Sequence, residues 1–542
     1  MSTTDHEPSS TPSNDILWER MLLASAVAAV FLVVLAVGGT ALVTKAMGVY
    51  RAWTPPVTAV ATLIVVSILA PWARRGRGPL AAAARRLPPA LDGSFRRRPL
   101  AAGLVGLATL VAVAQVTRLS CFMADPTLRW GSAYPPVEEY GVRHMCLSAY
   151  IYAADLTRRG VSNVYAEEYY PAYHVGKGRE SQPISSGVSN LAPHIRDAFE
   201  YPPPFLLLPR AALVVTNDFL AIRTGWFMLQ TILFLAIALT LASRIGGDRG
   251  MLAGLLLPVL LLSFPFMFNF QWGQFHLAVI VLAVGGMLAM SARRDRLGGA
   301  LLGAAIVTKA FPALLLLYLA VKKRGRPVFW TLAFALIYVI ASFVVLGPAP
   351  YRAFFVYHLP RVASGEAFSF FLNSDLTLAA NTSVLAIPYK LGRLGVPGMS
   401  AAVANILVWL FTALLVGAVI VAARRNRESS LEPVIWLGIL ALGAMRSPDA
   451  PNVYTGTAAL WLLTLLAVET RGRIPAVALL VLAFVCMSVQ PPLPDPETTI
   501  VLWMSGQFAM LVLGFWVLLR RQTITRERKS QRLDSAGGMF IE

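Results

Sequence analysis

Long hydrophobic stretches separated by short polar connections dominate this 542-residue chain and predict membrane-spanning helices. A helix needs about 20 apolar residues to cross the hydrocarbon core of a bilayer. In lipid the backbone must satisfy its own hydrogen bonds, which favours helices over irregular segments. The clearest stretches fall at residues 22–43, 55–71, 100–116, 219–242, 251–264, 276–290, 327–346, 401–421, 434–444, 455–466, 476–489 and 500–519. We therefore predict an all-α, polytopic integral membrane helical bundle with about 13–14 hydrophobic segments.

Two further hydrophobic stretches do not fit simple crossings. Residues 297–321 have basic clusters at both ends and contain Lys309 and Pro312 in the middle. One arrangement is a hairpin of two short helices with Lys309 at the tip, and the other is a single helix that buries the lysine. We favour the hairpin, because a lysine at mid-membrane is costly. The second stretch, 202–215, begins with three prolines, so we expect a re-entrant or interfacial piece that lines a cavity.

Basic residues set the expected orientation of this bundle. The formal net charge is +19, and a run of arginines occupies the single connection 73–98. Cytoplasmic connections of membrane proteins are enriched in Arg and Lys, so we place this connection and both termini in the cytoplasm. The same rule explains the positive charge without nucleic-acid binding. Only 14% of the residues are charged, against about a quarter in soluble domains, which also indicates a multi-pass protein of the cell membrane.

This orientation divides the chain into six parts. They are a disordered cytoplasmic tail at 1–16, three transmembrane helices with the basic loop 73–98 at 17–117, an extracytoplasmic loop with short helices at 118–202, core helices with a second outer loop 347–400 at 203–400, C-terminal transmembrane helices at 401–520, and a basic cytoplasmic tail at 521–542.

The extracytoplasmic loop holds most of the candidate chemistry. It is rich in tyrosine, histidine and carboxylates, and the carboxylates are Asp125, Glu138, Glu139, Asp155, Glu167, Glu168, Glu180, Asp197 and Glu200. Under the predicted topology, further polar residues at the ends of hydrophobic segments face the same side. They are Gln274, His276, Lys309, His358, Asn381 and Arg446. Such groups are costly near a membrane unless they serve a site, so we predict an active cleft at the outer membrane surface.

The residue types in this cleft suit transfer of a group from a lipid phosphate to a hydroxyl. Lys309, His276, His358 and Arg446 are cations or potential cations that can hold a phosphate. A carboxylate of the loop can act as general base. The sequence contains no G-x-x-x-x-G-K-[ST] phosphate-binding loop, which argues against an ATP-driven pump and a nucleotide-sugar transferase.

Cysteine and histidine spacing indicates neither a metal site nor a settled disulfide. We find no clustered zinc spacing and expect no metal and no other cofactor. Cys121 and Cys146 both fall in the extracytoplasmic loop, where they either form a disulfide or remain free thiols.

The order of several short motifs resembles a known family. The motifs are YPPPFLLLP at 201–209, GQFH at 273–276, LLGAAIVTKAFP at 301–312 and NTS at 381–383. Together they resemble the GT-C glycosyltransferases, in particular the GT87 (DUF2029) family of polyprenyl-phosphate-mannose-dependent mannosyltransferases. The family pattern is a Tyr-Pro-Pro near the end of the first loop, a Gly-Gln-x-Asn/His turn and a Gly-x-x-x-x-x-Lys-x-x-Pro hairpin. The resemblance extends over roughly residues 149–383.

The resemblance implies an inverting glycosyltransferase with a GT-C-like fold, and a polyprenyl-phosphate sugar, in this family mannose, as donor co-substrate. A loop carboxylate would deprotonate the hydroxyl of a lipid or glycan acceptor. Tyr201, Gln274, His276, Lys309, His358, Asn381 and Arg446 would then bind substrate. Family members often have an Asp near the position of Cys146, so the base must be another residue. We rank Glu139 first, then Asp125, Glu138 and Asp155.

Two other kinds of protein share this pattern of helices. A polymerase or ligase of lipid-linked glycans also combines a polytopic body with an outer loop. A transporter or flippase would show internal repeats and a binding site at the membrane midplane. We see no clear repeat, and the polar groups gather at one face, so the sequence favours the glycosyltransferase.

Overall fold

The computed structural model describes residues 99–124, 144–170, 186–192, 194–372, 374–426, 432–469 and 495–520, with single residues at 34, 38, 481, 482 and 484. These residues are almost entirely helical, and the predicted all-α membrane bundle is confirmed. The one sheet found among them is a parallel pair of two-residue strands, β1 (His144–Met145) and β2 (Ile195–Arg196). The predicted helices 22–43 and 55–71 and most of 476–489 lie outside the described residues.

The longer helices follow the hydrophobic stretches of the sequence. They are α4 (Pro99–Ala124), α8 (Phe219–Ile245), α12 (His276–Ser291), α13 (Asp295–Thr308), α15 (Gly325–Leu346), α20 (Ala401–Arg425), α21 (Glu432–Ala444), α22 (Asn452–Glu469) and α24 (Pro496–Leu519). Five helices in the described part are long and apolar enough to cross a membrane, namely α8, α15, α20, α24 and α4 from Leu104 onward. The others are shorter, and α12, α21 and α22 are almost entirely buried inside the bundle.

The segment predicted as one crossing over 251–264 is bent instead. It consists of α9 (Gly247–Leu255), α10 (Leu257–Leu262) and α11 (Phe264–Trp272), with a bend of 64° between Leu262 and Phe264. Pro265 stands in the first turn of α11, where a proline needs no backbone donor and fixes the chain for a new helix. The apolar run therefore continues beyond its predicted end, up to Trp272.

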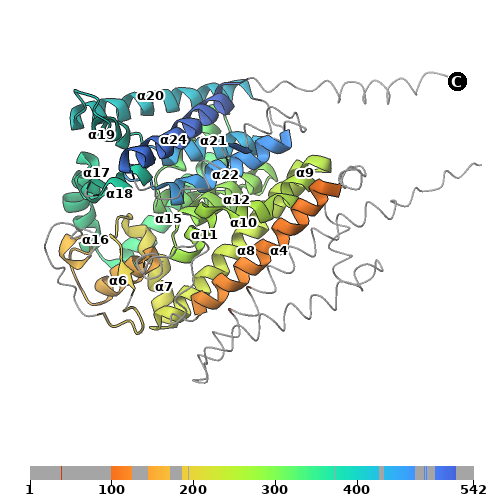
Figure 1. Cartoon of the computed structure of the whole chain (residues 1–542). Coiled ribbons are helices and arrows are strands. Elements are labelled where there is room, and N and C mark those ends of the chain that lie inside the picture. The colour runs from red at the N-terminus through yellow and green to blue at the C-terminus, as the bar shows by residue number, and fades with distance from the viewer. Residues whose placement is uncertain are drawn as a thin grey trace, which may run out of the picture.

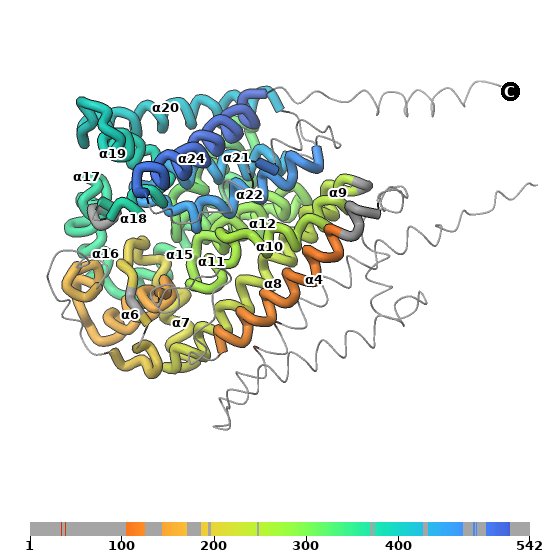
Figure 2. The backbone as a smooth tube through the Cα atoms, in the orientation of Figure 1, coloured from red at the N-terminus to blue at the C-terminus, as the bar shows by residue number. Residues whose placement is uncertain are grey.

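Two long connections supply short helices at one end of the bundle. The first holds α6 (Cys146–Arg158), the 3₁₀ helices Glu167–Tyr169 and Pro203–Leu206, and α7 (Leu207–Val215). The second holds α16 (Ala349–Arg352), a π-helical turn Ala353–His358, α17 (Leu359–Ser364), a 3₁₀ segment Glu366–Leu372, α18 (Asp375–Ala380) and α19 (Ala386–Arg393). In Figures 1 and 2, α6, α7 and α16 lie together at the lower left of the bundle.

The stretch 202–215, predicted to be a re-entrant or interfacial piece, is a short helical piece. Its 3₁₀ turn buries Pro203, Pro204, Phe205 and Leu206, and α7 follows directly. Val214 and Val215 at the end of α7 are more than four-fifths exposed. A short helix with exposed apolar residues at one end suits the interface of a membrane.

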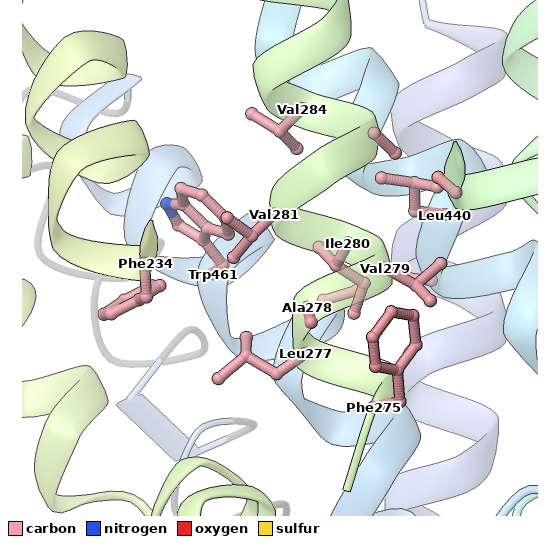
Figure 3. Packing of buried hydrophobic residues seen from close by; sticks show 14 of the residues in the cluster. Phe234, Phe275, Leu277, Ala278, Val279, Ile280, Val281, Val284, Leu440 and Trp461 are labelled. Atoms are coloured by element: carbon pink, nitrogen blue, oxygen red, sulfur yellow. The ribbon is translucent and has the colours of Figure 1, made fainter. Parts of the chain in front are cut away.

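Helix α12 forms the centre of the core. Nearly all of its residues are buried, which explains why its sequence is apolar on every side. Figure 3 shows its side chains among Phe234 of α8, Leu440 of α21 and Trp461 of α22. Because α12 is fixed on all sides, the polar residues at its first turn have a fixed position.

The hairpin predicted over 297–321 is confirmed. Helix α13 ends at Thr308, α14 (Ala313–Val321) begins after Pro312, and Lys309 lies between them. Lys309 lies beside His276 at the start of α12, whereas Arg324 donates to the carbonyl of Met290 near the end of α12. The two ends of the hairpin therefore meet opposite ends of the bundle.

An ion pair inside the bundle anchors the far end of this hairpin. Glu432 at the start of α21 accepts hydrogen bonds from Lys322 Nζ and from the Tyr318 hydroxyl, each at 2.6 Å. Both Glu432 and Tyr318 are buried. A buried carboxylate with two such donors has the partners that its charge requires.

Close packing of α13 against α15 fixes the hairpin along its length. A Cβ on Gly299 would lie 2.6 Å from the carbonyl carbon of Trp330 and 2.9 Å from the backbone nitrogen of Thr331. Gly303, one turn later, also faces the backbone of α15. Small residues four apart let two membrane helices approach closely.

We expect Gly299→Ala to destabilise the protein by about 1–3 kcal/mol, because the new methyl group would push the backbones of α13 and α15 apart. This cost outweighs the helix propensity of alanine, which favours it over glycine by about 1 kcal/mol. Thermal unfolding of the detergent-solubilised protein measures the change.

Gly417→Ala in α20 is the matched control, since nothing lies within 4 Å of a Cβ at that position. Only the higher helix propensity of alanine acts there, so we expect an unchanged or slightly higher unfolding temperature. If both variants unfold at the same temperature, the close packing of α13 on α15 is not what holds the hairpin.

Candidate active site

A short parallel ladder places Cys146 beside Asp197. His144 is in register with Ile195, and Met145 is in register with Arg196. The residues that directly follow the two strands are therefore Cys146, the first residue of α6, and Asp197. Neighbouring strands lie about 4.8 Å apart, so side chains at equivalent positions are within contact distance. The ladder thus joins the start of α6 to a carboxylate 51 residues later.

Asp197 is held by groups from this ladder. Its Oδ2 lies 3.5 Å from His144 Nε2 and 3.5 Å from Cys146 Sγ, and its Oδ1 accepts a hydrogen bond from the Ala198 backbone N–H at 3.2 Å. Burial alone would raise the pKa of Asp197, because it disfavours the charged carboxylate. The charge and hydrogen bond of His144 and the hydrogen bonds from Cys146 and Ala198 outweigh burial, so the pKa is lowered. The side chain is 25% exposed, so this carboxylate is ionised and accessible.

Cys146 is a buried thiol in a polar surrounding. The Tyr454 hydroxyl lies 3.2 Å from its sulfur, and Gln274 Nε2 lies 3.6 Å away. Burial and the nearby charge of Asp197 raise the pKa of this thiol well above its usual value. Cys146 is therefore a neutral thiol. The structure has no bond between it and Cys121, and both cysteines are free and buried.

The turn at residues 273–276 connects the loop to the bundle. Gly273 ends α11 in the left-handed region with φ of +62°, and a Cβ there would lie 2.7 Å from Leu147. Glycine is needed for both reasons. The side-chain oxygen of Gln274 is within hydrogen-bonding distance of the hydroxyls of Tyr150 (2.6 Å) and Tyr201 (2.7 Å). Thus Gln274, Tyr150 and Tyr201 form one buried network.

Lys309 meets this network from the tip of the hairpin. Its Nζ lies 3.4 Å from His276 Nδ1 and 4.9 Å from the centre of the Tyr201 ring, a cation–π distance. Cys146, Asp449 and Glu200 lie close enough to act electrostatically on the ammonium group. None of the carboxylates in the described part of the chain forms a salt bridge with Lys309. Its charge is therefore available to an anionic ligand.

Asp449 provides a second carboxylate near Lys309. Burial and the charge of Asp197 raise the pKa of Asp449 to about 7, although Lys309 acts in the opposite direction. The loop that carries Asp449 is held by Asn381, whose side-chain oxygen accepts from the backbone N–H groups of Ser383 and Ala450. Asn381 also donates to the carbonyl of Pro448. Within this structure Asn381 positions the loop, and its predicted contact with substrate stays a prediction.

His358 lies one layer behind Tyr201. Its ring stacks on Tyr165 with centroids 4.5 Å apart, and the Tyr165 hydroxyl donates to the backbone carbonyl of Tyr201. His358 thus supports the tyrosine that faces Lys309. Its role as a substrate ligand stays a prediction.

Arg446 points away from the cluster. Its Nε donates to the Thr412 hydroxyl of α20, and its guanidinium lies 5.7 Å from the centre of the Trp409 ring. Trp409 is largely exposed on the apolar surface of α20. Of the predicted substrate-binding residues, the structure brings Tyr201, Gln274, His276 and Lys309 together, with Asn381 and His358 behind them and Arg446 apart.

The predicted catalytic carboxylates Glu139, Asp125 and Glu138 lie outside the described residues and stay predictions. Asp155, ranked after them, is fully buried and accepts hydrogen bonds from Arg158, Ser186 and the Gly187 backbone N–H. These bonds hold the loop onto α6 and satisfy the carboxylate.

Sequence reasoning did not single out Asp197, Tyr150 or Tyr454. Asp197 stands four residues before the Tyr-Pro-Pro motif, which is a weak signal for it. The ranking favoured carboxylates next to predicted helix ends, whereas the two-residue ladder that brings Asp197 to Cys146 has no hydrophobic pattern.

The ladder also creates a donor set that could hold a metal ion. The side-chain donor atoms of His144, Cys146 and Asp197 all lie within 4.8 Å of one another. Nitrogen, sulfur and oxygen donors of this kind suit zinc. Each group also has a hydrogen-bonding or ion-pair partner in the protein, which is sufficient to explain the arrangement.

Comparison with known proteins agrees with these motifs. Residues 199–448 match the model of glycosyltransferase family 87, a range that includes Tyr201, Gln274, Lys309 and Asn381. Searches of curated proteins and of solved structures returned no match. The matched part of the chain is therefore that of a family 87 glycosyltransferase, and the apolar helices make it a membrane glycosyltransferase.

Proposed function

We propose that this glycosyltransferase moves a sugar, mannose in the first instance, from a polyprenyl-phosphate donor to a hydroxyl of a lipid or glycan acceptor. The observation that carries the proposal is the convergence of Lys309 and His276 with Asp197 and Asp449 at one end of an apolar bundle. A cation that lacks a salt bridge within the described residues suits the phosphate of a lipid donor. A nearby carboxylate suits the acceptor hydroxyl.

The proposed reaction is a single inverting displacement. A carboxylate takes the proton of the acceptor hydroxyl while its oxygen attacks the anomeric carbon. The phosphate oxygen leaves with the bonding electrons, and Lys309 stabilises the charge that develops there. The transporter alternative falls away because the family is one of transferases.

We further propose that the site faces the extracytoplasmic side. This is supported by the basic residues at the opposite end of the hairpin, where Lys322 pairs with Glu432 and Arg324 meets the end of α12. Arg293, Arg294 and Lys323 belong to the same end by their place in the chain. Basic residues gather on the cytoplasmic side of membrane proteins.

We expect membranes that contain the protein to transfer radiolabel from synthetic polyprenyl-phosphate mannose to an extractable product. They should not transfer it from GDP-mannose when synthesis of the lipid-linked sugar is blocked. Thin-layer separation of lipid and glycan fractions measures both reactions. Membranes that lack the protein are the control. Transfer from GDP-mannose alone, or none from the lipid donor, would remove the proposed donor class.

We expect Lys309→Met to raise the KM for the polyprenyl-phosphate donor about 10- to 100-fold, since hydrogen bonds to a charged group contribute about 1.5–3 kcal/mol. Lys309→Arg should lose less, because the positive charge remains. Initial rates at several donor concentrations give both values.

Lys323→Met is the matched control, because Lys323 is an exposed lysine at the other end of the hairpin. Its KM should equal that of the unaltered protein. An unchanged KM in Lys309→Met would show that Lys309 does not bind the donor phosphate.

A further inference from the structure

We propose that Asp197 is the general base that takes the proton of the acceptor hydroxyl, an inference that rests on the proposed transfer reaction. The argument comes from the ladder β1–β2, which fixes Asp197 beside Cys146, and from the bonds that orient its carboxylate. Three further observations support it: the position of Asp197 relative to Lys309, the accessibility of its carboxylate, and the state of the other carboxylates nearby.

The position of Asp197 links it to the phosphate side of the site. Cys146 touches Asp197 at 3.5 Å and is 3.6 Å from Gln274, which hydrogen-bonds Tyr201, and Tyr201 lies under the ammonium of Lys309. Asp197 and Lys309 thus belong to one cluster, linked through Cys146, Gln274 and Tyr201. An inverting transferase needs a base and a phosphate-binding cation, and this cluster contains a candidate for each.

The bonding of Asp197 leaves one oxygen able to accept a proton. Oδ2 is engaged by His144 and Cys146, whereas Oδ1 accepts from the Ala198 backbone N–H. An ionised carboxylate oxygen has two lone pairs, so within the described part of the chain Oδ1 keeps one for a ligand. The bonds to Oδ2 hold the orientation of the carboxylate, which is the preorganisation that general-base catalysis requires.

Other described carboxylates near the cluster are less suited to this role. Glu167 is paired with Arg361, and Asp155 is fully buried with three donors. Asp449 has a pKa of about 7 because of burial and the charge of Asp197, so it is protonated in much of the neutral range. The side chain of Asp197, by contrast, is 25% exposed, so its carboxylate is accessible to an acceptor hydroxyl.

The step balances without any added reagent. The acceptor oxygen forms a bond to the anomeric carbon, and its proton passes to Oδ1 of Asp197. The bond between the anomeric carbon and the phosphate oxygen breaks, and its electron pair leaves with polyprenyl phosphate. Water then removes the proton from Asp197 and restores the carboxylate.

The first test is Asp197→Asn, which keeps the size of the side chain and removes its basicity. We expect kcat to fall by about 10²–10⁴-fold, the usual contribution of a general base, while the KM for polyprenyl-phosphate mannose stays within about twofold. Asp197→Glu should retain part of the activity. Glu366→Gln is the matched control, because Glu366 is a largely exposed carboxylate of the second connection, and its rate should not change.

The second test moves the carboxylate across the ladder. In the double variant Cys146→Asp with Asp197→Asn, the new carboxylate starts from the neighbouring strand position, so we expect at least a tenfold recovery over Asp197→Asn. Cys146→Ser with Asp197→Asn gives a polar side chain without a base and should show no recovery. A residue that only stabilised the fold would not be replaced by a carboxylate at another position.

The outcomes separate this inference from the proposed function. If the unaltered protein transfers no sugar from the lipid donor, the proposed function fails and the role of Asp197 fails with it. If the unaltered protein is active and Asp197→Asn keeps its kcat, or Glu139→Gln alone abolishes transfer, only the inference is overturned. Zinc content is a further test. If the purified protein holds one equivalent of zinc and Asp197→Asn loses it, the inference is overturned, because the carboxylate is then a metal ligand. The inference is also overturned if Asp197→Asn unfolds, whereas Cys146→Asp with Asp197→Asn folds and remains inactive.

Discussion

The buried side-chain oxygen of Gln274 is the constraint on which the arrangement of the site depends. In an apolar bundle a polar group without partners destabilises the fold, so its partners must come from nearby segments. The partners here are Tyr150 of α6 and Tyr201 from the end of the first connection. A further bond runs from Gln230 of α8 to the backbone carbonyl of Gln274. These hydrogen bonds join the loop to the membrane helices, so the loop has a single position on the bundle.

The hairpin of α13 and α14 adds the charge that this network lacks. Lys309 reaches the tyrosines for two reasons. Glycines in α13 let this helix pack against the backbone of α15, and Lys322 and Tyr318 fix the other end of the hairpin on Glu432. The protein therefore holds a cation at the edge of an apolar interior by fixing both ends of a short helix pair. A longer helix without the break at Lys309 would carry the lysine into the core, where its charge is costly.

The sequence predicted the parts of this architecture that depend on hydrophobic length and on charge. The helices follow the apolar runs closely, and the basic residues on both sides of 297–321 were enough to predict the hairpin. Family resemblance was enough to select Tyr201, Gln274, His276 and Lys309, which the structure brings together. The bend between α10 and α11 was missed because no charge interrupts that run, although Pro265 marks the position. Arg446 was grouped with the site by topology alone, and topology does not show that its partners are Thr412 and Trp409 on α20.

The position of Asp197 could not be predicted because it depends on a contact between residues 51 positions apart. The motif comparison placed an expected acidic residue near Cys146 and found a neutral thiol there. In space, the parallel register puts a carboxylate at the adjacent strand position, 3.5 Å from that sulfur. A catalytic group is defined by where its atoms lie relative to the substrate. Residues that follow two neighbouring strands can place a side chain at nearly the same point in space. A carboxylate can therefore be absent from the expected position in a motif and still be present in the site, supplied by the strand beside it.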